Sequence, residues 1–143
     1  MNIQGHAAVV TGAASGLGAA SAAELARAGA KVSCFDVDLD RARAVAQKIG
    51  GHAVRCDVTS AEQASSALAE AGERHGAARI LVHCAGVGPA KRIVGRDGPM
   101  PLADYERVIT INLIGTFNMM RLVAAAMQKL SPLAEDERGV IIT

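Results

Sequence analysis

The chain has 143 residues, which fits one domain with its own core. Its 15 Lys and Arg nearly balance its 14 Asp and Glu, and no basic block or aromatic stripe is present, so we expect no nucleic-acid partner. The apolar runs are short and interrupted. The first residues also lack the charged head and long apolar stretch of a signal peptide, so we expect no membrane segment.

The three cysteines, Cys34, Cys56 and Cys84, are widely spaced and lie in or beside apolar runs. This usage is typical of reduced, buried cysteines and predicts a cytoplasmic location. No Cys or His pair has the spacing of metal ligands, so we expect no metal site.

Apolar runs of strand length alternate with longer helical segments along the chain. Strands are expected at residues 6–11, 31–36, 52–57, 80–82 and from 138 onward. Helices are expected at residues 16–29, 40–49, 60–75 and 102–130, with a loop rich in Gly and Pro at 86–101. Thr59 and Glu62 have the spacing of a capping box for the third helix.

The order of these elements predicts an α/β fold. Strands that are apolar throughout, separated by helices, indicate a parallel sheet covered on both faces. Right-handed crossovers make it a doubly wound sheet. Because no linker or repeat interrupts the pattern, we expect residues 1–143 to belong to a single domain with about five strands.

The segment TGAASGLG, residues 11–18, follows the first strand and opens the first helix. In this context Gly12 can take a tight turn, Gly16 allows the backbone to approach a pyrophosphate, and Gly18 allows close packing of helix on strand. The N–H groups at the start of the helix favour an anion. A turn of small residues made only for packing is the alternative.

Asp36 ends the second strand, a little over twenty residues after Gly12. A carboxylate there can accept both hydroxyls of an adenosine ribose and would repel a 2′-phosphate, which favours NAD over NADP. The neighbouring Ser15 and Val37 are neutral, while Asp38 and Asp40 are interpreted as caps of the second helix. A plain turn residue at the strand end is the alternative for Asp36.

The segments TGAASGLG, CDVTS, HCAG and INLIGTFN, together with Asp36, resemble the short-chain dehydrogenase/reductase family over the whole chain. The resemblance implies a Rossmann-type domain that transfers hydride between NAD(P) and an alcohol or ketone. It assigns Asp57 and Val58 to adenine, although Asp57 could also serve only as a helix-start residue. It assigns Cys84, Ala85 and Gly86 to the ribose and nicotinamide side. The cofactor-binding residues expected in all are Gly12, Ser15, Gly16, Leu17, Gly18, Asp36, Asp57, Val58, Cys84, Ala85 and Gly86.

Asn112 matches the asparagine of the family's catalytic helix, which supports a water linked to the catalytic lysine. His83 departs from the family pattern, which has Asn there to tie the fourth strand to its neighbour. A ring nitrogen of His83 could replace that amide, so we interpret His83 as structural. We expect His6, His52 and His75 to lie at the surface.

The family's remaining chemistry needs a serine and a tyrosine four residues before a lysine. The only tyrosine is Tyr105, and Ile109 lies four residues on. The sequence stops at Thr143, inside the expected fifth strand and before the position of the serine. We therefore expect these residues to be the N-terminal part of a longer enzyme, and to be inactive alone.

Within the family, the segments CAGVG, NLIGTFNMMRLVAAAM and DERGVIIT and the long loop resemble type II 3-hydroxyacyl-CoA dehydrogenases. The resemblance implies oxidation of a 3-hydroxyacyl-CoA by NAD. Another alcohol or ketone, such as a 3-oxoacyl carrier-protein, a steroid or a sugar alcohol, is one alternative, and a non-catalytic nucleotide-binding protein is another. Lys91, Arg92 and Arg96 could meet CoA phosphates or form a solvated basic loop. The helix at 102–130 is apolar on more than one face, and the family resemblance implies that it pairs in a homotetramer.

Overall fold

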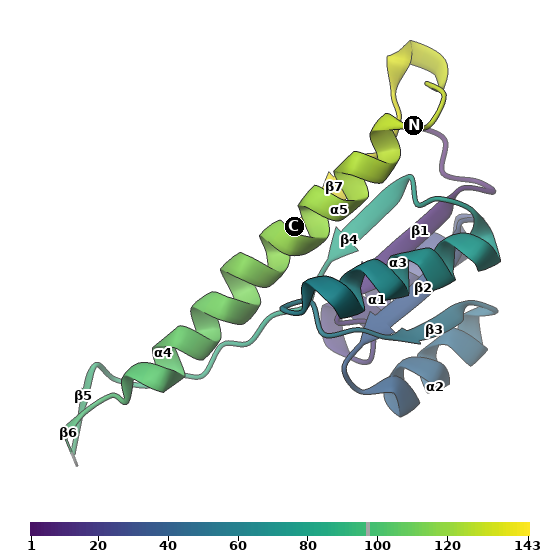
Figure 1. Ribbon diagram of the computed structural model, residues 1–143. Coiled ribbons are helices and arrows are strands. Elements are labelled where there is room, and N and C mark those ends of the chain that lie inside the picture. Colours follow the sequence, from purple (N-terminus) through teal and green to yellow (C-terminus); the bar gives the residue numbers. More distant parts are fainter. Residues whose placement is uncertain (97) are drawn as a thin grey trace.

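The computed structural model describes residues 1–96 and 98–143 and shows a parallel sheet between helices (Figure 1). The five strands of this sheet lie in the order β3-β2-β1-β4-β7 and all pair in parallel. Their bounds are β1 Ala7–Thr11, β2 Lys31–Asp36, β3 His52–Arg55, β4 Ile80–His83 and β7 Val140–Ile142. The predicted doubly wound α/β fold is therefore confirmed.

Two helices cover each face of the sheet. The helices α1 (Gly16–Arg27) and α2 (Leu39–Ile49) share one core cluster with the strands, and α3 (Ala61–His75) and α5 (Thr116–Gln128) share the other. Successive residues of β1 alternate between them: Ala8 and Val10 belong to the first cluster and Val9 to the second. The helices α1, α2 and α3 contribute mainly alanine to the core, and such small side chains let them approach the sheet closely, whereas α5 contributes Met119, Val123 and Met127.

Several predicted boundaries were wrong by one or two residues. Strand β1 begins at Ala7, β3 ends at Arg55, and α1 ends at Arg27. The capping box of Thr59 and Glu62 was also wrong. Ser60 is the N-cap of α3, since its Oγ accepts a hydrogen bond from the Gln63 N–H at 3.2 Å. The Thr59 hydroxyl instead donates to Asp57 Oδ1 at 2.7 Å, so it has another acceptor close at hand.

The expected long helix consists of three segments in series and ends at Gln128. They are α4 (Leu102–Ile109), the π-helical segment η1 (Thr110–Gly115) and α5. The preceding loop is not wholly irregular, because β5 (Val94–Gly95) and β6 (Gly98–Pro99) form an antiparallel pair. This pair and α4 extend away from the sheet (Figure 1).

By length and composition alone, the helix Leu102–Gln128 is apolar enough to cross a membrane, which the short apolar runs had not suggested. A single helix of this kind is weak evidence, because core helices of globular proteins pass the same test. In this chain Met119, Val123 and Met127 pack against the sheet. Other large apolar side chains of the helix are exposed: Leu102, Tyr105, Leu113, Ile114, Phe117 and Met120.

Candidate functional site

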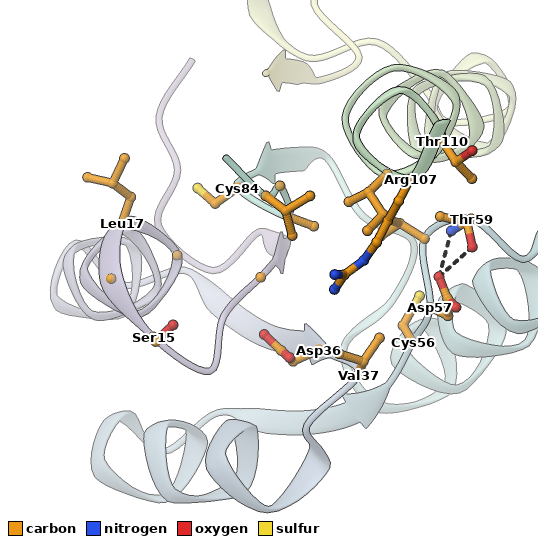
Figure 2. A pocket seen from close by; sticks show the side chains of 18 of the residues that line it. Ser15, Leu17, Asp36, Val37, Cys56, Asp57, Thr59, Cys84, Arg107 and Thr110 are labelled. Carbon is orange, nitrogen blue, oxygen red and sulfur yellow. Dashed lines mark hydrogen bonds between the residues drawn. The ribbon is translucent and has the colours of Figure 1, made fainter. Parts of the chain in front are cut away.

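A cleft of about 880 Å³ opens where β1, β2 and β4 end. In a doubly wound sheet, ligands bind outside the carboxyl ends of the strands. All the expected cofactor-binding residues line this one cleft (Figure 2): Gly12, Ser15, Gly16, Leu17, Gly18, Asp36, Asp57, Val58, Cys84, Ala85 and Gly86. The fold thus brings together residues from four separate stretches of the sequence: 12–18, 36, 57–58 and 84–86.

The three glycines of the turn have different surroundings. A Cβ on Gly18 would lie 2.2 Å from the Gly12 carbonyl oxygen, and one on Gly12 would lie 2.8 Å from the Cys84 carbonyl oxygen. These two glycines are needed for packing. A Cβ on Gly16 would meet no atom within 4 Å, and Gly16 has a φ of +52°. Gly16 is therefore the glycine that keeps the backbone accessible from the cleft.

The start of α1 faces the same space. Ser15 is its N-cap residue, but the Ser15 side chain makes no capping hydrogen bond, and the first turn contains no acidic residue. The first N–H groups of a helix have no partner within the helix and carry the positive end of its dipole. This end of α1 can therefore hold an anionic group.

Asp36 is held in place from both sides. Its Oδ2 accepts a hydrogen bond from the Ala14 N–H, and its Oδ1 accepts one from the Asp38 N–H, each at 3.0 Å. Asp38 caps α2 as expected, accepting from the Arg41 N–H at 3.1 Å. Neither Arg41 nor Arg43 lines the cleft, so no cation of α2 offsets the charge of Asp36 there.

Asp57 has the helix-start role considered for it, and its role at the adenine stays a prediction. Its Oδ1 accepts hydrogen bonds from the Thr59 N–H at 2.9 Å and from the Thr59 hydroxyl at 2.7 Å, which forms the turn into α3. Asp57 also lines the cleft. The next residue, Val58, is held by α5, because the Asn118 amide donates to its carbonyl oxygen at 2.8 Å. Sequence reasoning missed this buried Asn118.

His83 ties β4 to β1, as expected for a structural residue. Its Nδ1 lies 2.9 Å from the Thr11 Oγ1, which also accepts a hydrogen bond from the Ala85 N–H at 3.2 Å. These contacts hold the backbone that follows β4 at the cleft. Burial lowers the pKa of His83, so its neutral form is favoured. Its Nε2 is buried and has no partner among the residues that the structure describes.

Asn112 lies in the π-helical segment η1, beside the cleft rather than in its lining. Its Oδ1 accepts from the Val87 N–H and its Nδ2 donates to the Val87 carbonyl oxygen, both at 2.9 Å. The side chain thus holds the loop after β4 against the long helix. The Asn112 carbonyl oxygen accepts from the Thr116 hydroxyl at 2.6 Å. The role of Asn112 in supporting a catalytic water stays a prediction.

The remaining expectations were met in part. Cys34 and Cys56 are buried, but Cys84 is only half-buried and lines the cleft. His52 contacts Glu70 at 2.8 Å, while the Nε2 atom of His75 is buried, so His75 is not simply a surface residue. In the long loop, Lys91 pairs with Asp104 of α4 at 2.5 Å, which gives one of the basic loop residues a structural contact.

Sequence reasoning missed the contribution of α4 and the start of η1 to the cleft. Ala103, Glu106, Arg107 and Thr110 line it together with Ile111. Their spacing of three or four residues, which places side chains on one face of a helix, was the available signal. The Arg107 side chain points from α4 into the cleft (Figure 2). The other lining residues that were missed are Val37, Cys56, Thr59 and Val87.

The parallel sheet, the glycine turn and the cleft at the carboxyl ends of the strands define a Rossmann-like α/β protein. The chain belongs to the short chain dehydrogenase family, whose family model matches residues 6–143.

Comparisons with individual proteins agree with this family. The chain is 39% identical to 3-hydroxyacyl-CoA dehydrogenase type-2 of Rattus norvegicus, over 99% of this chain and 56% of that protein. A crystal structure of hydroxysteroid dehydrogenase from Escherichia coli superposes with a TM-score of 0.80 at 36% identity, covering 98% of this chain and 57% of the other. A crystal structure named ribose-5-phosphate isomerase, from Brucella melitensis 16M, has a TM-score of 0.82 at 35% identity, covering 98% of this chain and 51% of the other. The chain spans about half the length of these proteins.

Proposed function

We propose that this chain forms the cofactor-binding part of an NAD-dependent oxidoreductase. The observation that carries the proposal is the convergence of the glycine turn, Asp36 and Asp57 on one cleft at the carboxyl ends of β1, β2 and β4. The bound NAD would accept or supply the hydride in the reaction. The chain's own residues bind and orient it.

The cleft fits a dinucleotide part by part. The open N-terminus of α1, with Gly16 beside it, suits the pyrophosphate. Asp36 suits the adenosine ribose, because a carboxylate has more lone pairs than its two backbone hydrogen bonds use. Asp57 and Val58 lie beyond it and suit the adenine, and Cys84, Ala85 and Gly86 suit the nicotinamide side.

Asp36 also favours NAD over NADP. Because both of its oxygens accept backbone hydrogen bonds, the carboxylate cannot turn away from a 2′-phosphate without losing them. A fixed negative charge next to a phosphate is repulsive.

The substrate we propose is a 3-hydroxyacyl-CoA, oxidised to the 3-oxo form. The similarity to the type-2 dehydrogenase of Rattus norvegicus supports it. A steroid is the alternative supported by the Escherichia coli relative. We propose that the serine and the tyrosine–lysine pair lie in residues that follow Thr143 in the complete protein, so that these 143 residues bind cofactor without turnover. We also propose a cytoplasmic location.

We propose that the long helix pairs with its copy in another subunit of a homotetramer. Its exposed side chains Leu113, Ile114 and Phe117 form an apolar surface beside the core-facing Met119 and Val123. Contiguous apolar surface of this kind marks a contact with another protein surface. Phe117→Glu places a charge on this surface and should weaken the association, which analytical ultracentrifugation measures. An unchanged mass distribution in the variant would count against pairing through the long helix.

The cofactor proposal is tested by titrating the chain with NADH and NADPH and following their fluorescence. NADH should bind at least about tenfold more tightly, and Asp36→Asn should reduce that preference. Asp40→Asn, which removes a charge outside the cleft, is the matched control. Tighter binding of NADPH by the unaltered chain would refute the choice of NAD.

The proposal of an enzyme is tested first, by reading the gene beyond the codon for Thr143, and the substrate is tested second. A serine followed within about twenty residues by Tyr-x-x-x-Lys supports an enzyme, and the absence of that pattern supports a nucleotide-binding protein. The longer protein, if the gene encodes it, is then assayed with 3-hydroxybutyryl-CoA and with a hydroxysteroid. Activity on the steroid alone would replace the proposed substrate.

A further inference from the structure

We propose that Arg107 is a positioning residue for the adenosine half of the cofactor, with its guanidinium group covering one face of the adenine. The inference rests on the proposed function. It concerns α4, the first segment of the expected helix at 102–130, in which only Asn112 had been assigned to the site.

The first observation that supports the inference is the position of the Arg107 side chain. Arg107 projects from α4 into the cleft, toward the side where Asp36 and Val37 lie (Figure 2). Asp57 and Cys56 border the same part of the cleft (Figure 2). This is the end of the cleft that suits the ribose and the adenine, and it lies away from the glycine turn that suits the pyrophosphate.

The second observation that supports the inference is the set of contacts that Arg107 makes. Arg107 forms no ion pair or side-chain hydrogen bond with any residue in the two described stretches, 1–96 and 98–143. The carboxylates that border the same part of the cleft are held by backbone N–H donors: Asp36 by those of Ala14 and Asp38, and Asp57 by that of Thr59. An exposed arginine with no partner contributes little to the fold. Within these stretches, Arg107 therefore makes no side-chain contact that a ligand would have to displace.

The chemistry of the group selects the adenine face. A guanidinium is planar and weakly hydrated, and it stacks on flat aromatic rings. Arg107 lies near the carboxylate of Asp36, which would repel a phosphate group placed beside the guanidinium. The adenine ring is neutral and has a π face, so it is the better partner for the guanidinium plane. Val37 lies on the other side of the same space and supplies an apolar surface for the opposite face of the base.

The helix that carries Arg107 is also tied to neighbouring segments of the chain. None of the α4 side chains is buried, so α4 is positioned by its neighbours along the helix. Asn112, five residues after Arg107, ties η1 to Val87, and Lys91 ties the loop to Asp104 of α4. These contacts lie on both sides of Arg107.

The test compares Arg107→Leu and Arg107→Lys with the unaltered 143-residue chain. NAD⁺ and AMP are titrated by calorimetry, and ribose 5-phosphate, which lacks the base, by NMR. Both variants should bind NAD⁺ and AMP about fivefold more weakly, because neither Leu nor Lys offers a planar cation, and ribose 5-phosphate should be unaffected. Lys129→Leu removes the same charge at the other end of the long helix and should change nothing. Circular dichroism shows whether each variant folds.

Unchanged affinity in Arg107→Leu would overturn the inference. Full recovery of affinity in Arg107→Lys, or an equal loss for ribose 5-phosphate, would also overturn it, because either result assigns Arg107 to a phosphate or to charge alone. If the unaltered chain binds neither NAD⁺ nor AMP, the proposed function itself fails. A chain that binds both, with no effect of Arg107, leaves the proposed function standing and removes only this inference.

Discussion

The Asp36 carboxylate accepts a hydrogen bond from the Ala14 N–H at 3.0 Å, which joins the end of β2 to the glycine turn that follows β1. The residue proposed to select the cofactor is thus also a structural support of the turn proposed to hold its pyrophosphate. The same carboxylate takes the Asp38 N–H, at the start of α2.

Asp36→Ala should therefore destabilise the chain as well as weaken its binding of NADH. Two backbone N–H groups lose their acceptor, and an unmade hydrogen bond of this kind costs about 1–3 kcal/mol when the group is buried and less where water can replace the acceptor. The free energy of unfolding in urea measures the loss. Asp40→Ala removes an exposed carboxylate of α2 and is the control. Equal stability of the two variants would contradict a structural role for Asp36.

Gly16→Ala and Gly18→Ala should differ in what they impair. At Gly16 the added Cβ meets open space, so the cost is mainly the positive φ, about 1 kcal/mol, and NADH binding should fall because the methyl group enters the cleft. At Gly18 the Cβ would lie 2.2 Å from the Gly12 carbonyl oxygen, so the fold itself must shift. Thermal unfolding and NADH titration separate the two effects. A Gly18→Ala variant as stable as Gly16→Ala would argue against this packing.

The stability of the chain should fall as the pH drops below about 6.5, with His83 among the causes. Burial lowers the pKa of His83 in the fold from its usual value of 6.5. Between that lowered pKa and 6.5, the unfolded chain binds a proton that the folded chain does not, so the free energy of unfolding decreases with falling pH. The stabilisation is complete above pH 6.5 and is lost as the pH falls through the lowered pKa.

His83→Asn should flatten this pH dependence, because asparagine does not titrate and its amide can still meet the Thr11 hydroxyl. Urea unfolding at several pH values between 7 and 5 measures it. Burial lowers the pKa of His75 as well, so His75→Asn is measured alongside to separate the two contributions. An identical pH slope in His83→Asn and the unaltered chain would show that His83 does not contribute.

Asn112→Ala should release the loop after β4. The amide group of Asn112 makes both hydrogen bonds to Val87, so the Val87 N–H loses its acceptor in the variant. Hydrogen exchange at Val87 should become faster, with a loss of stability of about 1 kcal/mol. Gln128→Ala, at the exposed end of α5, controls for changes in the helix. Unaltered exchange at Val87 would mean that the loop is held by other contacts.

Local signals were sufficient for most of the elements. The segment 31–36 reads as a strand from its apolar residues alone, and β2 has those bounds. The glycine turn and Asp36 are identified by their positions after two successive strands, which parallel pairing brings to the same edge of the sheet. The cap of α3 could not be chosen by spacing, because Thr59 and Ser60 both precede the helix and the nearby Asp57 carboxylate engages the Thr59 hydroxyl.

The sequence by itself determined the order of the strands and helices along the chain, the parallel sheet covered on both faces, and the ends of β1 and β2, because these follow from periodicity over a few neighbouring residues. Only the tertiary structure showed that the side chain of Asn112 forms hydrogen bonds with Val87 and that His83 forms one with Thr11. It also showed that Arg107 faces Asp36 and Val37. Those relationships join residues between 25 and 72 positions apart in the chain. They depend on how helices and strands pack against one another, which no local pattern encodes.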